Sequence, residues 1–505
     1  MSDPSDLAVR AVLDPPPDPP GPPAATPSTG VPAPAGARST APGTARTPDL
    51  TDEPDPAGEP DPVGEPDPGP VLDPADAAFA RDPYPYYAAL RSQGPAARVA
   101  LANGTHAWLV TGYEQSRAVL TDPRFSNVPP QGAGRRKPDS PAQRARACLA
   151  RHMLNSDVPD HTRLRRLTAA AFTPRRVDAL RPRIERLTDG LVTDLAARLE
   201  GGATADLVDG FAFPLPVLVI GEVLGVPEAD RGDLREWTYR VGSPADALER
   251  GAVDEAWTAL YGYFTGLIAE KRRRPGEDLF SALVHDATEG GLDDGELLAM
   301  AFLLLFAGYE TTMNLLASAS LMLLTHPAEL ETALRQGPDR WAAVVEETLR
   351  HASPLEGTTW RRTTEAVDLG GGALVPAGAS VLAVLAAANR DPSRYPDPDA
   401  FRPERYLAGT DGAGASAGAG VDGCSAANHA GTVSGQRRAA PHVAFGHGPH
   451  FCVGSRLARL EAAVALPRLF TAFPGLRLAA DLAGLPYRPG LLVRGPRQVP
   501  VTTAS

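Results

Sequence analysis

The sequence predicts a mainly α-helical protein with a smaller β part. Three observations support this fold class. Apolar residues recur with helical spacing over much of the stretch from about residue 161 to 350. Shorter strand-like segments lie before and after that stretch. A glycine-rich loop at 445–454 then leads into a last predicted helix at 455–472.

The remaining elements follow from the same patterns. The motif Asp82-Pro-Tyr-Pro-Tyr86 leads into a helix-like stretch, and residues 95–112 are predicted to form a small sheet. The main predicted helices are 161–172, 176–199, 252–274, 295–325 and 338–350. Strand-like segments return at 359–369 and 379–385, before a turn-rich stretch from Asp391 to Phe401.

Two segments have too few apolar residues to form a packed core. Residues 1–70 contain 20 prolines and are predicted to be a disordered tail rich in Pro, Asp and Glu. Residues 408–438 are rich in Gly, Ala and Ser and are predicted to be a flexible surface loop. The folded domain is therefore expected to span residues 71–505, with 408–438 as an insertion.

Charge and composition give no support for nucleic-acid binding. The chain of 505 residues is 43% apolar and 22% charged, as expected for a soluble globular protein. Its net charge is -12, of which the 12 acidic and 3 basic residues of the tail account for -9, so the body carries only -3. Nothing in this balance supports nucleic-acid binding, which needs a basic surface.

The cysteines and the N-terminus predict a cytoplasmic protein. Cys148, Cys424 and Cys452 are an odd and sparse set, which argues against a disulfide framework. The N-terminus has neither a basic region nor an apolar core typical of a secretory signal. The apolar run Leu297–Tyr309 is 13 residues long, short of the roughly 20 that span a membrane. We therefore expect a buried helix here and no membrane association.

The most informative segment is Phe445-Gly-His-Gly-Pro-His-Phe-Cys-Val-Gly454. Its glycines allow the backbone to approach a flat cofactor closely, and Cys452 precedes a helix start, which favours a thiolate. Three interpretations compete: Cys452 as a haem ligand, as an inert buried thiol, or as part of a zinc site with His442, His447 and His450. The spacing is not that of paired zinc ligands, so the loop favours haem.

This loop resembles the haem-binding signature of the cytochrome P450 superfamily, Phe-Gly-x-Gly-x-His-x-Cys-x-Gly, at every specified position. The resemblance implies a triangular helical prism that holds haem b (iron-protoporphyrin IX) between a long distal helix and the helix after the cysteine. It implies that Cys452 is the metal ligand, with Phe445 and Gly454 in the cofactor-binding loop. Further motifs match the superfamily in the expected order over about residues 72–500.

Two of these motifs concern structure and proton supply. Glu347 and Arg350 lie three residues apart, which alone indicates a surface pair, but the resemblance implies a buried structural pair completed by Arg405. In Ala307-Gly-Tyr-Glu-Thr-Thr312, Gly and polar residues are costly in an apolar helix. One explanation is structural, with Thr311 bonded to a carbonyl and Glu310 in a buried pair. The resemblance implies instead an oxygen-binding kink at Ala307 and Gly308, with Thr311 and Glu310 as catalytic residues that deliver protons to dioxygen.

Two other motifs concern the cofactor. His161 and Arg165 are four residues apart and share a helix face, where they suit a carboxylate. The alternative is a solvated basic face, since Arg163 and Arg166 are close by. The resemblance implies that His161, Arg165, His450 and Arg361 bind the haem propionates, although Arg362 is an alternative to Arg361 because strand neighbours face opposite ways.

The resemblance implies a haem-thiolate monooxygenase that hydroxylates or epoxidises a small organic substrate with O2, in secondary metabolism. Electrons come from a separate ferredoxin and ferredoxin reductase, which we expect to dock near Arg456, Arg459 and the basic 161–166 stretch. The protein is expected to be a monomer. Two alternatives stay open, an O2-independent rearrangement and a non-enzymatic haem or metal binder. The substrate pocket is expected to draw on Phe302, Leu303, Phe306 and residues 125–152, 355–359 and 489–493, which do not identify the substrate.

Overall fold

The fold is described by a computed structural model that covers residues 70–102, 104–128, 140–242, 250–285, 291–407 and 441–503. The predicted tail, apart from Pro70, and the predicted loop 408–438 lie outside these residues. The helices described are α2 (Ala77–Arg81), α3 (Tyr84–Gln93), α4 (Tyr113–Thr121), α5 (Pro141–Leu149), α6 (Asp160–Ala171), α7 (Pro174–Ala179), α8 (Arg181–Arg198), α9 (Pro214–Leu224), α10 (Arg231–Gly242), α11 (Arg250–Arg273), α12 (Leu279–His285), α13 (Asp294–Thr325), α14 (Pro327–Gln336), α15 (Pro338–His351), α16 (Leu385–Ala388) and α17 (Ser455–Ala472). The strands described are β1 (Val71–Leu72), β2 (Ala96–Leu101), β3 (His106–Val110), β4 (Phe125–Ser126), β5 (Ala205–Asp206), β6 (Arg361–Thr363), β7 (Val367–Asp368), β8 (Leu374–Val375), β9 (Ser380–Ala383), β10 (Arg477–Leu478) and β11 (Pro500–Thr502).

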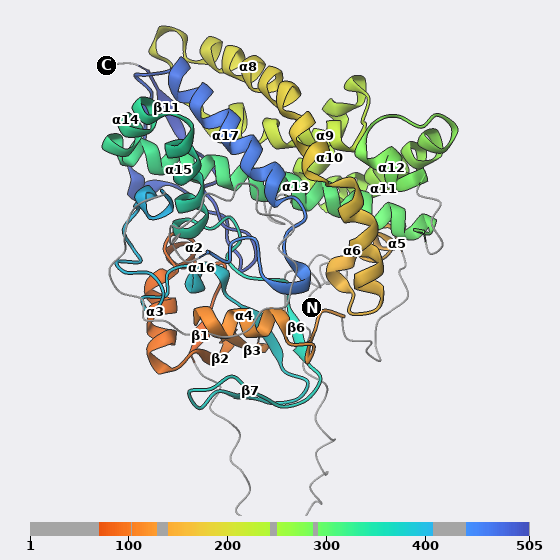
Figure 1. The fold of residues 1–505 in the computed structure, drawn as a ribbon, viewed down its shortest axis with the longest axis vertical. Helices are drawn as coiled ribbons and strands as arrows, with labels where there is room; N and C mark the ends of the chain where they lie inside the picture. Colours follow the sequence, from red (N-terminus) through yellow and green to blue (C-terminus); the bar gives the residue numbers. More distant parts are fainter. Residues whose placement is uncertain are drawn as a thin grey trace, which may run out of the picture.

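Helix α13 crosses the helical part of the molecule through its middle (Figure 1). It starts with a capping box, in which the Asp293 side chain accepts from the Glu296 amide and the Glu296 side chain accepts from the Asp293 amide. It ends before His326, because Pro327 disfavours helical backbone in the preceding residue. The helix is long and apolar enough to cross a membrane, but 61% of its most apolar stretch is buried inside the protein. This burial fits the predicted core helix.

The helices around α13 form the main hydrophobic core. Helices α5, α9, α11, α15 and α17 all contact α13. Most of α9 is buried, because its sequence Pro-Leu-Pro-Val-Leu-Val-Ile is apolar on every side. Helix α17 occupies the predicted range 455–472 and crosses near α13 in Figure 1. The start of α17 is therefore held in a fixed position relative to the middle of α13.

One predicted helix is two helices in the structure. The segment predicted at 176–199 divides into α7 and α8 around Leu180. Pro182 lies in the first turn of α8, where its missing amide hydrogen costs nothing, so a new helix starts there. The single-helix prediction was wrong because apolar periodicity continues across the break.

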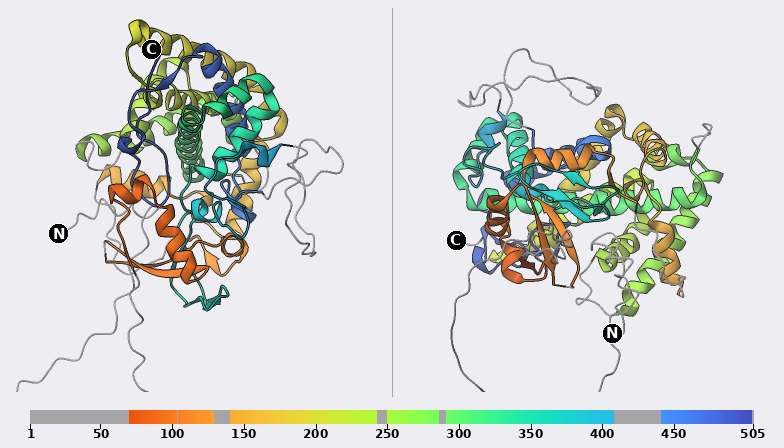
Figure 2. Two further views of the ribbon diagram at one scale, coloured as in Figure 1. Left: turned by 90° about the vertical axis from the view of Figure 1, so that its left-hand side faces the viewer. Right: turned by 90° about the horizontal axis from the view of Figure 1, so that it is seen from below.

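The β part forms the other side of the molecule and carries one of the predicted cofactor-binding residues. Six strands pair in the order β1-β2-β3-β9-β6-β4, with α3 and α4 alongside (Figures 1 and 2). The register pairs Trp108 of β3 with Val381 of β9, and Arg361 of β6 with the same Val381. The segment predicted as one strand at 359–369 is two short strands, β6 and β7, which belong to different sheets. The remaining sheets are the three-stranded β10-β11-β5 and the hairpin β7-β8.

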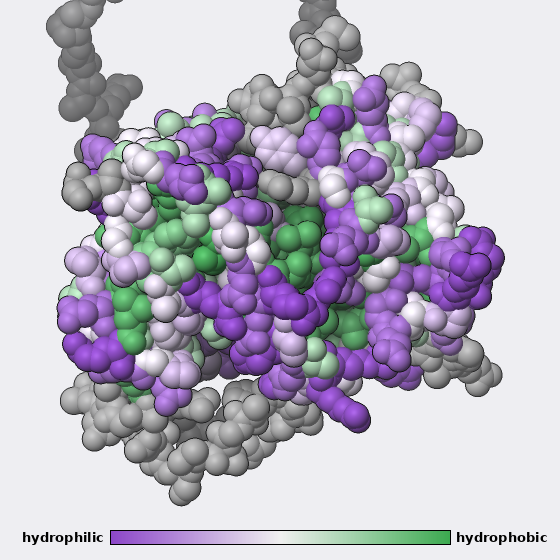
Figure 3. All heavy atoms as spheres, turned by 90° about the horizontal axis from the view of Figure 1, so that it is seen from above, coloured by the Kyte–Doolittle hydropathy of each residue, from purple (hydrophilic) through white to green (hydrophobic). Residues whose placement is uncertain are grey.

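The outer surface is more polar than this core. Seen from above, hydrophilic side chains form most of the raised surface, and hydrophobic ones gather in its hollows (Figure 3). Single large apolar residues such as Tyr239 and Leu334 are exposed, which is ordinary for a folded protein.

Candidate active site

The cysteine loop turns sharply and then presents Cys452 at the start of α17. Gly446 and Gly448 have φ angles of 73° and 68°, which residues with a Cβ rarely adopt. The Cys452 amide donates to the Phe445 carbonyl at 2.9 Å, which closes the loop. The backbone amides of Gly454 and Ser455 hydrogen-bond to the Cys452 sulfur. These amides are the free donors of a helix start, so they stabilise an anionic sulfur.

The surroundings of Cys452 are those of a recessed thiol. Its side chain is accessible, yet burial among protein atoms raises its pKa. An accessible side chain enclosed by protein lies in a recess and not on the outer surface. The Gly454 amide and the positive charges of Arg165 and Arg459 oppose the effect of burial on the pKa. The site thus supplies donors and cations that favour the thiolate form.

The middle of α13, like Cys452, contains residues that are accessible although the protein surrounds them. Ala307 is exposed and Thr311 is half-buried, although the helix is otherwise mostly buried. These two residues are one turn apart and share a face. One turn earlier, Leu303 packs in a cluster that includes Val453, the neighbour of Cys452. The accessible face of α13 and the cysteine loop are therefore joined through a shared packing cluster.

Four predicted cofactor-binding residues meet beside Cys452. The rings of His161 and His450 have centroids 4.0 Å apart. Burial, the neighbouring His161 and Arg361 lower the pKa of His450 to about 3. Burial likewise lowers the pKa of Arg361 to about 10. Arg165 completes the group, since its positive charge acts to lower the pKa of both His161 and Cys452.

Two of these residues have buried nitrogens that need a partner. His161 Nε2 and Arg361 Nε have no hydrogen-bond partner among the described residues. A buried polar nitrogen without a partner is costly, so an acceptor is expected there. A carboxylate can accept from the cationic guanidinium of Arg361 and from an imidazole N–H of His161. A haem group brings two propionates as well as an iron that a thiolate can bind, so the donor set fits haem.

The structure distinguishes Arg361 from Arg362. Arg361 is 4% exposed, and its charge acts on both histidines. Arg362 points elsewhere, with its guanidinium close to Gly378. The two residues are strand neighbours and so face opposite sides of the sheet.

Two further residues near this cluster escaped the sequence analysis. The Asn127 side-chain amide donates to His450 Nε2 at 3.0 Å, and the Asn127 backbone amide donates to Asp157 at 2.9 Å. Asp157 lies just before α6 and four residues before His161, and this closeness in sequence is the one signal that could have indicated it. Asn127 carries no local signal, because its contact with His450 spans 323 positions.

Glu347 and Arg350 form a buried ion pair. Both side chains are 0% exposed, and Arg350 donates to Glu347 at 2.7 and 2.8 Å. Arg350 also donates to the carbonyls of Asn389, Pro398 and Ala400. Arg405 Nε lies 3.4 Å from Glu347. The pair therefore holds the turn-rich stretch after β9 against α15, and it is not the exposed pair that its spacing alone indicates.

Glu310 and Thr311 do not act as a bonded acid–alcohol pair in this structure. The Thr311 hydroxyl donates to the Ala307 carbonyl at 2.8 Å, and Glu310 accepts from Arg488 at 2.8 Å. Consecutive helix residues point in different directions, which separates the two side chains. Among the described residues, the contacts of Glu310 and Thr311 therefore match the structural explanation, in which Thr311 bonds a carbonyl and Glu310 is in a buried pair. Arg488 was not found from the sequence, because it lies 178 positions away.

The zinc alternative finds no support. His442 contacts Glu346 at 3.1 Å, His447 lies 3.4 Å from Arg117, and His450 lies beside His161. In the part of the chain that the structure describes, no group of three or more potential ligands could hold a metal ion.

The expected docking arginines are already paired. Arg456 binds Asp178 at 2.5 and 3.0 Å, and Arg459 binds Glu346 at 2.6 and 2.9 Å. Arg163, in the basic 161–166 stretch, binds Glu296. Their charges are therefore partly neutralised, which weakens the prediction that they attract a partner.

The expected substrate-pocket residues separate into two groups. Phe302 and Phe306 are half-buried and contact Trp257 of α11. The Phe306 ring stacks on Trp257 at a centroid distance of 6.1 Å, and the Phe302 ring lies tilted at 5.0 Å. Leu303 is 6% exposed and belongs to the core. Leu355 pairs with Val493, so the segments expected at 355–359 and 489–493 do meet. Residues 129–139, part of the expected 125–152 segment, lie outside the described residues.

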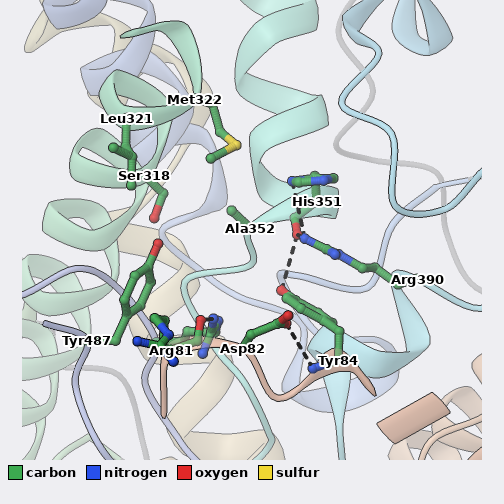
Figure 4. A pocket seen from close by; sticks show the side chains of 11 residues that line it. Arg81, Asp82, Tyr84, Ser318, Leu321, Met322, His351, Ala352, Arg390 and Tyr487 are labelled. Atoms are coloured by element: carbon green, nitrogen blue, oxygen red, sulfur yellow. Dashed lines mark hydrogen bonds between the residues drawn. The ribbon is translucent and has the colours of Figure 1, made fainter. Parts of the chain in front are cut away.

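A separate cavity of about 250 Å³ lies further along α13 (Figure 4). It is lined by Arg81, Asp82, Tyr84, Ser318, Leu321, Met322, His351, Ala352, Arg390, Tyr487 and Arg494. Arg390 donates to the His351 carbonyl and Arg494 to the carbonyls of Ala80 and Arg81. These guanidiniums connect chain segments to one another, so the cavity is a structural junction.

Comparisons with known proteins decide the family. The family model described as cytochrome P450 matches residues 341–475. The chain is 43% identical to the cytochrome P450 monooxygenase PikC of Streptomyces venezuelae over 84% of this chain and 91% of that protein. The chain belongs to the cytochrome P450 family. This P450 is also 37% identical to the 6-deoxyerythronolide B hydroxylase of Saccharopolyspora erythraea, over 84% of this chain and 96% of that one.

Solved structures agree with this membership. The LnmA cytochrome P450 hydroxylase from the leinamycin biosynthetic pathway of Streptomyces atroolivaceus matches this P450 with a TM-score of 0.66 and 34% identity. The match covers 83% of this chain and 96% of that one. The predicted fold, the thiolate-bound haem cofactor and the monooxygenase class are thereby confirmed at the level of the family.

Proposed function

We propose that this P450 uses haem bound through Cys452 to insert one oxygen atom of O2 into a small organic substrate, by hydroxylation or epoxidation. The observation that carries the proposal is the recessed Cys452 at the start of α17, whose sulfur receives the Gly454 and Ser455 amides. Haem, when bound there, would supply an iron that activates O2, and a thiolate ligand from Cys452 would favour cleavage of the O–O bond.

The chain itself provides the electrostatics of the thiolate. Burial raises the pKa of Cys452, and the two amides and the charges of Arg165 and Arg459 oppose that rise in part. Arg459 also lies over the Phe445 ring, 4.4 Å from its centroid. We assign to this group the role of keeping the sulfur anionic and of tuning its electron donation.

The propionates would be held by His161, Arg165, Arg361 and His450. The nitrogens of His161 and Arg361 that lack a partner among the described residues are buried and available to a carboxylate. Buried and fixed by the sheet and by α6, they would set the position of the cofactor relative to Ala307 and Gly308 on α13.

Proton supply would depend on Thr311 and Glu310. Because the Thr311 hydroxyl donates its hydrogen to the Ala307 carbonyl, its oxygen is left to accept a hydrogen bond from water or from substrate. Glu310 is buried enough that its pKa is raised, although Arg488 lowers it. We assign to Glu310 the proton source and to Thr311 the group that orients the final donor.

Electrons would come from a separate ferredoxin and ferredoxin reductase. Helix α7 packs against α17, which follows Cys452, and it carries the exposed Arg175 and Arg176. Arg166 on α6 is also exposed. These arginines replace Arg456 and Arg459 as the proposed contacts for an acidic partner, because exposed charges steer association.

The substrate class follows from the apolar wall and from the relatives. Trp257, Phe302 and Phe306 form an aromatic wall beside the accessible face of α13. Relatives include a hydroxylase of 6-deoxyerythronolide B and one from the leinamycin biosynthetic pathway. We therefore propose an apolar secondary metabolite as substrate, and a monomeric cytoplasmic enzyme whose catalytic domain spans residues 71–505, with 1–70 as a tail.

Oxygen isotope labelling tests this function. Compounds that shift the spin state of the haem are selected first, and turnover is then run under ¹⁸O2 with surrogate ferredoxin and reductase. We expect one ¹⁸O atom in each product molecule. An isomer of the substrate that forms without O2 would establish the rearrangement alternative instead, and added oxygen that comes from water alone would contradict the monooxygenase. Binding without any turnover would support a non-enzymatic haem protein.

A further inference from the structure

Helix α13 carries a polar ridge, defined here as Glu310, Asn314 and Ser318. These residues are spaced by four and therefore lie on one face of a helix that is otherwise largely apolar. Asn314 and Ser318 are 0% and 4% exposed. Both polar atoms of the Asn314 amide lack a hydrogen-bond partner among the described residues. Such a ridge is costly in a core helix unless another element requires it.

The element that faces the ridge is the C-terminal hairpin, residues 487–496. Tyr487 pairs with Pro496, and the Arg488 amide donates to the Gly495 carbonyl at 3.1 Å. On its other side the hairpin pairs with the segment after α15: Leu355 bridges Val493, and the Glu356 amide donates to the Leu492 carbonyl at 2.9 Å. The hairpin is thus fixed from two sides.

Each ridge residue has a counterpart in the hairpin. Glu310 accepts from Arg488 at 2.8 Å. Gly495 lies so close to Asn314 that a Cβ at this position would be 2.3 Å from Asn314 Oδ1. Tyr487 and Ser318 line one cavity, and the Tyr487 hydroxyl points toward Ser318 in Figure 4. These three contacts, spread over about two turns of α13, fix where Arg488 meets Glu310.

The ion pair controls the charge of Glu310. Burial raises the pKa of Glu310, and the positive charge of Arg488 lowers it. The other titratable group coupled to it is the buried phenol of Tyr309, which donates to the Thr238 carbonyl at 3.4 Å. Arg488 is therefore the group that favours the carboxylate form.

We infer that Arg488 is a positioning residue, through which the C-terminal hairpin holds Glu310 in place for proton delivery. The inference rests on the proposed function, because it takes Glu310 as the proton source. It adds that the hairpin, whose tip 489–493 is expected to border the substrate pocket, also orients the acid. Contact of substrate with the tip would then be transmitted to Glu310 through a two-stranded turn.

Infrared titration of the carboxyl group tests the structural half of the inference. The band of protonated Glu310 is assigned in the haem-loaded protein as the one lost in Glu310→Gln. Arg488→Met should move its titration midpoint to higher pH, and Arg488→Lys should restore the midpoint toward the wild-type value. The matched control is Arg497→Met, which changes an exposed arginine directly after the hairpin and should leave the midpoint unchanged. An unchanged midpoint in Arg488→Met overturns the inference.

The ratio of peroxide released to product formed tests the functional half. Its pH profile should shift in Arg488→Met in the same direction as the infrared midpoint, and Arg488→Lys should reverse most of that shift. A moved midpoint with an unmoved profile contradicts the positioning role. If Glu310→Gln itself leaves the ratio unchanged, the proposed proton source is wrong, whereas the infrared result reports on the Arg488 contact independently.

Discussion

Glu347 and Arg350, one turn apart on α15, are both completely buried and share hydrogen bonds of 2.7 and 2.8 Å. Removing one partner of such a pair leaves an uncompensated buried charge, which costs about 3–5 kcal/mol. Glu347→Gln should therefore lower the free energy of unfolding by that amount, measured by denaturant titration. The matched control is Glu331→Gln, which breaks the exposed pair of Glu331 with Arg335 and should cost less than about 1 kcal/mol. Similar costs for the two variants would contradict this account of the pair.

Arg361 should hold the cofactor, and its neighbour Arg362 should not. Arg361 has a buried Nε without a partner among the described residues, and its charge lowers the pKa of His161 and His450. Arg362 lies near Gly378 instead. A charge-assisted hydrogen bond contributes about 1.5–3 kcal/mol. Arg361→Met should therefore weaken haem retention by about 10–100-fold. The measurement is the rate at which haem transfers from the protein to apomyoglobin. Faster loss from Arg362→Met than from Arg361→Met would reverse the assignment.

Thr311 should matter for the use of O2 and its neighbour Thr312 should not. Both hydroxyls donate to carbonyls four residues earlier, but Thr311 is the more accessible of the two. Thr311→Ala should divert reducing equivalents to peroxide and lower the product yield by about tenfold. Loss of a general acid typically costs 10²–10⁴ in rate, but here water can replace the hydroxyl, so the expected effect is smaller. Thr312→Ala serves as the control. Equal coupling in wild type and Thr311→Ala would remove Thr311 from the mechanism.

Glu356 should make stability depend on pH. It is 2% exposed, bonded to the Tyr87 hydroxyl, and lies 3.8 Å from Arg494. Burial raises its pKa from 4.5 to about 7, so between these values the folded protein holds a proton that the unfolded chain has lost. The contribution of Glu356 to the free energy of unfolding is fully present below pH 4.5 and is lost as pH rises to about 7. The change amounts to about 3 kcal/mol.

The comparison for Glu356 is with Glu356→Gln, which removes the titration and keeps the shape. Free energies of unfolding are measured for both proteins at pH 5 and pH 8. The wild type should lose stability relative to the variant at the higher pH. A difference between the two proteins that is independent of pH would show that Glu356 is ionised throughout.

Local patterns predicted the parts of the fold that depend on neighbours in sequence. The ranges of α13 and α17 and the position of Cys452 before a helix follow from apolar runs, caps and glycines within a few residues. The break between α7 and α8 was missed, because apolar periodicity continued through Pro182. Element boundaries thus depend on single residues that periodicity overlooks.

The contacts that complete the site could not be predicted from local patterns. Arg488 reaches Glu310 across 178 positions, and Asn127 reaches His450 across 323. Trp257 joins the aromatic wall only because α11 packs on α13. The ion pairs of the expected docking arginines could not be predicted for the same reason, since Asp178 and Glu346 lie on other helices. Sequence shows which side chains are present, but partners on distant elements decide their charge.

The central claim is that Cys452 binds the haem iron as a thiolate, and the spectrum of the reduced protein with carbon monoxide tests it most directly. Folded, haem-loaded protein should show the red-shifted band that gives the family its name, and Cys452→His should lose this band while it retains haem. A band at the position typical of histidine-ligated haem in the folded wild-type protein, or its persistence unchanged in Cys452→His, would contradict the assignment.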